Sequence, residues 1–97
     1  MLQIRWSEKS LSDFIAILDY IKKDSPTNAK RVKTRINNFI KTIPSKPKMF
    51  RKDELKQNND GTFRVLTKNR IRVSYKIEST EIFIVKVSHS SQEPSHF

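Results

Sequence analysis

Four side chains in the C-terminal half of the chain carry the chemistry that this sequence offers. Arg64, Arg72 and Lys86 come from three successive apolar segments, and His89 closes the last of them. Arginine can hold a phosphate through paired hydrogen bonds and can stabilise the extra charge of a phosphorane. Histidine can take the proton of a 2′-hydroxyl or donate one to the leaving oxygen, which is what RNA cleavage without a metal requires. Arg64, Arg72 and His89 are therefore the candidate catalytic residues of a nuclease.

A structural interpretation of the same side chains stays open. His89 shares its parity with Val85 and Val87, so it can simply pack at the end of a strand, and arginines on strands are commonly solvated. Tyr75 lies among apolar residues and fits a core position better than a catalytic one. Separately, four cations are candidates for binding a nucleic acid or another target as point charges without base specificity: Arg51, Lys52, Arg70 and Lys86.

The composition removes most other reaction chemistries. The chain has no cysteine, which excludes disulfides and thiolate metal sites, and its single glycine excludes a glycine-rich phosphate loop. His89 and His96 stand seven residues apart in a polar stretch, which is a poor arrangement for metal ligands. We therefore expect no metal and no cofactor.

Four strands should position these residues. Ile71 to Ile77 alternates apolar and polar residues without a break, which is the period-2 pattern of a half-buried strand. Similar segments over 63–66 and 82–87 are joined to it by short links, which predicts an antiparallel meander. A further short strand is expected over 2–6. Arg64 and Arg72 have the parity opposite to the core, so we expect both on the uncovered face of the sheet.

Two amphipathic helices follow the first strand. Ser7 is the expected N-cap of the first, with Trp6 packing on Leu11, and the helix should end near residue 24. Ser25 and the following proline restart a helix that runs towards Pro44. The expected buried stripe of the first helix is Leu11, Phe14, Ile15, Leu18 and Ile21, and that of the second is Ala29, Val32, Ile36, Phe39, Ile40 and Ile43.

The predicted fold class is α+β in the order β-α-α-β-β-β, with the helical hairpin packed on one face of a small, mainly antiparallel four-stranded sheet. Residues 44–61 show no periodicity and are predicted to be a long loop. The whole chain, 1–97, is expected to be a single domain with a polar C-terminal tail from about residue 90. No apolar segment has the length of a membrane span and the start is too polar for a signal peptide, so we expect a soluble cytoplasmic protein.

The charge is strongly uneven. The formal net charge is +10; residues 1–29 hold four Lys/Arg and four Asp/Glu, whereas residues 30–56 hold ten Lys/Arg and two Asp/Glu. Eight of the ten net charges thus belong to the middle segment. Such an asymmetry indicates a nucleic acid or an acidic protein as partner, although a solvated basic surface without a specific partner would have the same composition.

Several segments in order resemble small bacterial toxins of the RelE/ParE superfamily, the toxic half of type II toxin-antitoxin pairs. The similarity covers nearly the whole chain. It lies in the opening strand that ends at Trp6-Ser7, the connection from Ser25 to Ala29, the strand from Arg72 to Ile77 and the closing Val85-Lys86-Val87-Ser88-His89. The resemblance implies a cognate antitoxin, with an acidic amphipathic C-terminal segment that wraps the toxin.

The superfamily implies two different activities. RelE-like members are ribosome-dependent mRNA endonucleases that use basic residues on the sheet face; Arg64 and Arg72 match two of these positions. Leu66, Ser90 or Ser91, and Phe97 stand where the other catalytic residues of that branch are found, so half of the set is missing. ParE-like members usually lack it and block DNA gyrase, and the long hairpin and the ending from His89 to Pro94 resemble that branch.

Three functions follow as alternatives. The first is growth arrest by a ParE-like block of DNA gyrase, which we favour. The second is a RelE-like, ribosome-dependent mRNA interferase, the one case in which the protein would be an enzyme. The third is a non-toxic basic module that binds nucleic acid.

Overall fold

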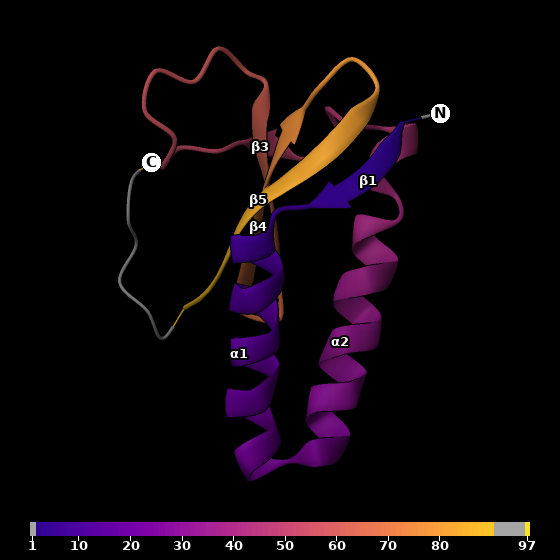
Figure 1. Ribbon diagram of the computed structural model, residues 1–97, viewed down its shortest axis with the longest axis vertical. Coiled ribbons are helices and arrows are strands. Elements are labelled where there is room, and N and C mark those ends of the chain that lie inside the picture. Colours follow the sequence, from indigo (N-terminus) through magenta and orange to yellow (C-terminus); the bar gives the residue numbers. More distant parts are fainter. Residues whose placement is uncertain (1, 91–96) are drawn as a thin grey trace.

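The computed structural model describes residues 2–90 and 97 and has the predicted α+β order (Figure 1). Two antiparallel helices, α1 (Glu8–Asp24) and α2 (Pro26–Ile40), are followed by a short 3-10 turn, η1 (Ile43–Ser45). The strands are β1 (Gln3–Trp6), β2 (Arg51–Lys52), β3 (Phe63–Lys68), β4 (Ile71–Ile77) and β5 (Glu81–His89).

One mixed sheet contains all five strands in the order β1-β5-β4-β3-β2. β1 runs parallel to β5, and the other pairs are antiparallel. The predicted fold class is confirmed, but the predicted number of four strands is wrong. The additional strand, β2, arises within the expected loop because Arg51 and Lys52 pair with Val65 and Arg64 on β3.

Serine side chains fix the start of both helices. The Ser7 hydroxyl accepts from the backbone N–H of Ser10 at 3.0 Å, and the Ser25 hydroxyl accepts from that of Asn28 at 3.1 Å. Trp6 stacks on Phe14, with ring centroids 5.6 Å apart, and Leu11, its expected partner, is 47% exposed.

The hydrophobic core lies between the helices and one face of the sheet. α2 buries Ala29, Val32, Ile36 and Ile40, as its pattern predicted apart from the half-buried Phe39. The stripe predicted for α1 is correct for Phe14, which is buried, and for Leu18 and Ile21, which are half-buried against the core. It is wrong for Leu11 and Ile15, which are 47% and 51% exposed, and α1 also buries Ser10 and Ile17. Ser10 can occupy a core position because its hydroxyl donates to the Ser7 and Ile84 carbonyls, both at 2.9 Å.

The second face of the sheet is also covered in part. Val65 and Ser74 are only 2% and 3% exposed, although Val65 is not part of the core cluster. The segment that follows β2 folds back here and pairs with the last residue: Gln57 N–H donates to the Phe97 carbonyl and Phe97 N–H to that of Leu55. Figure 1 shows the C-terminal residue beside this loop. The expectation of an uncovered face is therefore wrong.

Neither helix in the described part of the chain has both the length and the apolar character that crossing a membrane requires.

Candidate functional site

The strand register separates the two candidate arginines. Arg64 lies opposite Tyr75 and Arg72 lies opposite Thr67. Directly opposed residues share a face and successive residues alternate, so Arg64 is on the helix-covered face and Arg72 on the outer face. The prediction that both lie on one uncovered face is wrong for Arg64. Apolar residues occur on both parities of β3, so its sequence does not define which side is buried.

Arg64 holds the long loop in place. Its Nε donates to the Gly61 carbonyl at 2.9 Å and its Nη1 to the Phe50 carbonyl at 3.2 Å. The fully buried Tyr75 lies opposite it and donates its hydroxyl to the Pro47 carbonyl at 2.8 Å. The guanidinium of Arg64 thus stabilises backbone carbonyls at both ends of the segment 50–61.

Arg72 is held by two carboxylates. Its Nη2 lies 2.8 Å from Asp53 Oδ1 and its Nη1 lies 2.8 Å from Glu54 Oε1. Asp53 is fully buried and its Oδ2 has no hydrogen-bond partner among the described residues, so Arg72 is its counter-charge. An anionic ligand would have to compete with both carboxylates for this guanidinium.

The same arrangement lowers the pKa of Glu54. Burial raises the pKa of its carboxyl, but hydrogen bonds from backbone and from Arg72, together with attraction to Arg72 and Arg51, lower that pKa below its ordinary value. Arg51 pairs directly with Glu54. The outer face therefore carries a small network of two arginines and two carboxylates.

His89 lies on the helix side of the sheet. It is opposite Ile71 at the end of β5, and its ring centroid is 6.3 Å from that of Tyr20 on α1. Its partner position on β4 is four residues from that of Arg64, which corresponds to about 13 Å along a strand. Arg64, Arg72 and His89 therefore do not converge on one point.

The candidate target-binding cations are spread over several parts of the surface. Arg51 and Lys86 share the outer face, and Lys86 Nζ lies 5.2 Å from the Phe97 ring centroid. Lys52 is opposite Arg64 and exposed. Arg70 lies at the β3–β4 turn, where its Nε donates to the Ser90 hydroxyl at 2.9 Å.

The positions at which the nuclease set is incomplete have structural roles. Leu66 is buried in the core, and Phe97 packs edge-to-face on Phe63, with centroids 6.0 Å apart. Ser91, Pro94 and His96 lie outside the described residues. Within the described chain, no three His, Asp or Glu side chains are grouped so that they could hold a metal ion.

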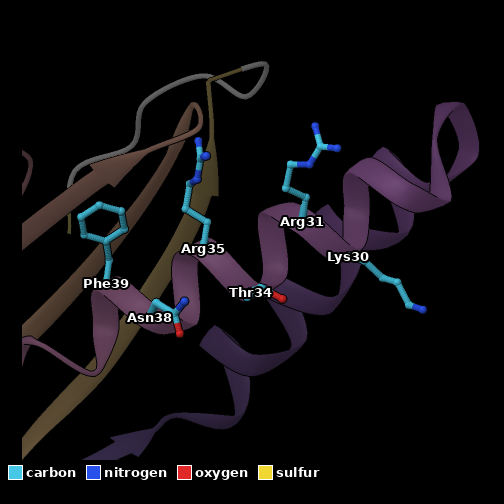
Figure 2. A pocket seen from close by; sticks show the side chains of 6 residues that line it. All are labelled: Lys30, Arg31, Thr34, Arg35, Asn38 and Phe39. Carbon is cyan, nitrogen blue, oxygen red and sulfur yellow. The ribbon is translucent and has the colours of Figure 1, made fainter.

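Two features were missed from the sequence. One is the pairing of Arg72 with Asp53 and Glu54, which could have been suspected because these are the only acids in residues 30–56. The other is a basic surface on α2, a helix without a single Asp or Glu. It has a shallow hollow of about 510 Å³ (Figure 2), lined by Lys30, Arg31, Thr34, Arg35, Asn38 and Phe39.

Comparison with known proteins identifies the family. The family model for the ParE toxin of the type II toxin-antitoxin system parDE matches residues 4–94. The chain belongs to the ParE toxin family. It is thus a toxin of a type II toxin-antitoxin system, and such a toxin has a cognate antitoxin. The resemblance to the RelE/ParE superfamily is confirmed.

Solved structures agree with this ParE-family fold. The chain matches the chromosomal ParDE TA system from P. aeruginosa with a TM-score of 0.71 and 20% identity, covering 92% of this chain and 96% of that one. It also matches the YoeB dimer from Staphylococcus aureus with a TM-score of 0.57 and 18% identity, covering 91% and 95%. Among curated proteins, none matches the chain significantly in sequence. At these identities the solved structures establish the fold alone.

Proposed function

We propose that this ParE-family toxin arrests growth by binding and blocking DNA gyrase, without cutting a nucleic acid. The observation that carries the proposal is the dispersal of the three candidate catalytic residues. Arg72 pairs with Asp53 and Glu54 on the outer face, whereas Arg64 and His89 lie at separate places on the helix side. General acid–base cleavage needs its groups within hydrogen-bond reach of one substrate phosphate.

The test compares the two targets with one toxin preparation. Purified toxin is titrated into a gyrase supercoiling reaction and, in parallel, into a translation reaction in which mRNA 3′ ends are mapped. We expect supercoiling to stop while the mRNA stays intact, and added antitoxin to restore supercoiling. Normal supercoiling at a large toxin excess, together with cleavage within ribosome-bound codons, would replace this proposal with the mRNA interferase alternative.

The groove between the two helices fits the antitoxin. It has a volume of about 450 Å³ and an apolar floor that includes Ile15, Leu18 and Ala29. Its charged lining residues are three lysines, Lys22, Lys30 and Lys33, and one acid, Asp19, and Ile15 is 51% exposed. An amphipathic helix with acidic flanks would bury the apolar floor and pair with these lysines.

Replacing Ile15 tests this surface. Ile15→Asp places a charge in the groove without disturbing the core, because the side chain is half exposed. We expect the variant to stay folded and toxic but to escape neutralisation by co-expressed antitoxin. The matched control is Ala16→Asp, at an exposed neighbouring position that is not among the groove residues. Full neutralisation of the Ile15→Asp protein would exclude the groove as the antitoxin site.

A further inference from the structure

The outer surface of α2 is an unbalanced cationic surface. Lys30, Arg31 and Arg35 are exposed, and none of them forms an ion pair within residues 2–90 and 97. Arg31 and Arg35 are four residues apart, so they lie one turn apart and repel each other. This pair adds no stability to α2, and the helix has no Asp or Glu to neutralise it. Such a surface suits an anionic partner.

The side chains form two parallel rows on this surface. Figure 2 shows Arg31, Arg35 and Phe39 projecting to one side of α2, while Lys30 points to the other. Thr34 and Asn38 follow Lys30 at intervals of four residues and line the same hollow. We define the α2 ridge as Lys30, Arg31, Thr34, Arg35 and Asn38.

The chemistry of the ridge matches a phosphate backbone better than an acidic protein. Protein interfaces place exposed apolar or aromatic anchors at their centre. The one aromatic residue that lines the hollow, Phe39, is half-buried, and Lys68 Nζ lies 5.2 Å from its ring centroid; the other lining residues are Lys, Arg, Thr and Asn. Arg, Lys, Thr and Asn are the side chains that hydrogen-bond to phosphate oxygens in protein–DNA contacts. The groove between the helices shares Lys30 with this surface, but it also has the apolar side chains of Ile15, Leu18 and Ala29, so it suits a partner with an apolar face.

We infer that the α2 ridge binds the backbone of duplex DNA, with Arg31 and Arg35 contacting successive phosphates of one strand. The rise between these residues in a helix is about 6 Å, a spacing close to that of neighbouring phosphates. A rigid helix matches the regular backbone of a duplex, whereas an irregular single strand would have to be ordered on binding. The contact carries no base specificity, because phosphates are the same in every sequence. DNA binding by the α2 ridge does not depend on gyrase being the target.

The experiment measures binding of a labelled random-sequence DNA duplex by fluorescence anisotropy over a range of salt concentrations. The test variant is Arg31→Gln with Arg35→Gln, since glutamine retains good helix propensity. The matched control is Lys46→Gln with Lys48→Gln, which removes the same charge from two other exposed positions of the basic segment. Circular dichroism verifies that both proteins are folded.

The expected result is a loss of DNA affinity of about tenfold or more for the α2 variant at physiological salt, with a salt slope reduced by roughly 1.8, because each phosphate contact contributes about 0.9. The control should change much less. Equal losses in both variants would overturn the inference, since net charge alone would then explain binding.

Two further arms distinguish other ligands. A single-stranded RNA of equal length that binds more tightly than the duplex, and loses affinity in the α2 variant, would overturn the assignment to duplex DNA. A polyglutamate peptide that loses affinity in the α2 variant while DNA binding is retained would make the ridge a protein site. Unchanged peptide binding beside weakened DNA binding supports the inference.

Discussion

At the scale of single residues, Arg72 and Asp53 form the pair whose removal is most informative. Asp53 is fully buried and Arg72 is its counter-charge, so Arg72→Ala leaves a carboxylate in the protein interior without compensation. Breaking a buried pair from one side costs about 3–5 kcal/mol, and the partial exposure of Arg72 points to the lower end of that range. Urea unfolding of the variant and the wild type measures this loss of unfolding free energy.

Two further variants distinguish the contribution of the Arg72–Asp53 pair from that of neighbouring charges. Asp53→Asn combined with Arg72→Ala should be less destabilised than Arg72→Ala alone, because no unpaired charge remains buried. Arg51→Ala breaks only an exposed pair with Glu54 and should cost less than about 1 kcal/mol. If Arg72→Ala were as stable as the wild type, Arg72 would be available for a ligand rather than committed to the fold.

Tyr75 gives the protein a specific sensitivity to alkali. Burial raises the pKa of its hydroxyl to about 12, against a smaller opposing effect of Arg64. Between pH 10 and about 12 the folded state keeps this proton and the unfolded state loses it, so stability falls as pH rises. In a Tyr20→Phe protein, Tyr75 is the one remaining tyrosine, and its absorbance titration should show ionisation well above pH 10. Ionisation near pH 10 in the folded protein would contradict this.

The residue scale is also where the sequence was least informative. The type and face of Arg72 could be predicted, because β4 alternates strictly. The pairing of Arg72 with Asp53 and Glu54 could not be predicted. Both acids lie in a segment without periodicity, and they reach the sheet only because the loop after β2 folds back onto it. Arg64 was placed on the wrong face for a different reason: both Val65 and Leu66 are buried, on opposite sides of the sheet.

At the scale of elements, the β3–β4 turn contains an unusual residue. Asn69 and Arg70 have φ angles of 53° and 65°, the pair of left-handed conformations that a two-residue hairpin turn requires. Asparagine tolerates this conformation, whereas for arginine it costs about 1–2 kcal/mol. Arg70→Gly should therefore stabilise the protein by about 1 kcal/mol, as measured by urea unfolding.

Measuring the toxicity of the Arg70→Gly protein together with its stability tests why an arginine occupies this strained position. A more stable but less toxic Arg70→Gly protein would mean that the guanidinium serves the target. The control, Asn69→Ala, should lower stability, because alanine disfavours the left-handed region. Loss of stability in Arg70→Gly would instead show that the hydrogen bond to Ser90 outweighs the strain of the turn.

The helices and the central strands were predictable at this scale because local chemistry defines them. Serine caps, the proline after Ser25 and the apolar periodicity of α2 agree with one another. β2 was not predicted, since two residues are too short for any pattern. The buried side of α1 was predicted in part: Phe14, Leu18 and Ile21 face the core, but Ser10 and Ile17 are buried where Leu11 and Ile15 were expected. The Ser10 hydroxyl donates to the Ile84 carbonyl, 74 residues away, a contact that helical periodicity cannot predict.

At the scale of the whole molecule, the concentration of charge predicts how the antitoxin is captured. Eight of the ten net charges lie within residues 30–56, which include most of α2. Long-range attraction to an acidic segment accelerates encounter and is screened by salt. We expect the association rate with the antitoxin to fall by at least about tenfold from low to high salt, with little change in the dissociation rate, as measured by stopped-flow or surface-based kinetics. A salt effect confined to dissociation would exclude steering.

The position of β5 has a consequence for synthesis. This strand lies between β1 and β4, and its Ile84 carbonyl accepts a hydrogen bond from the Ser10 hydroxyl of α1. Residues near the start of the sequence therefore have their partners on the strand that is synthesised last of the five. Until β5 is made, α1 lacks the strand on which it mainly packs, and contacts between residues far apart in the sequence form slowly. We therefore expect the nascent toxin to complete its sheet only after β5 has left the ribosome, which leaves an interval in which antitoxin already present can gather nearby.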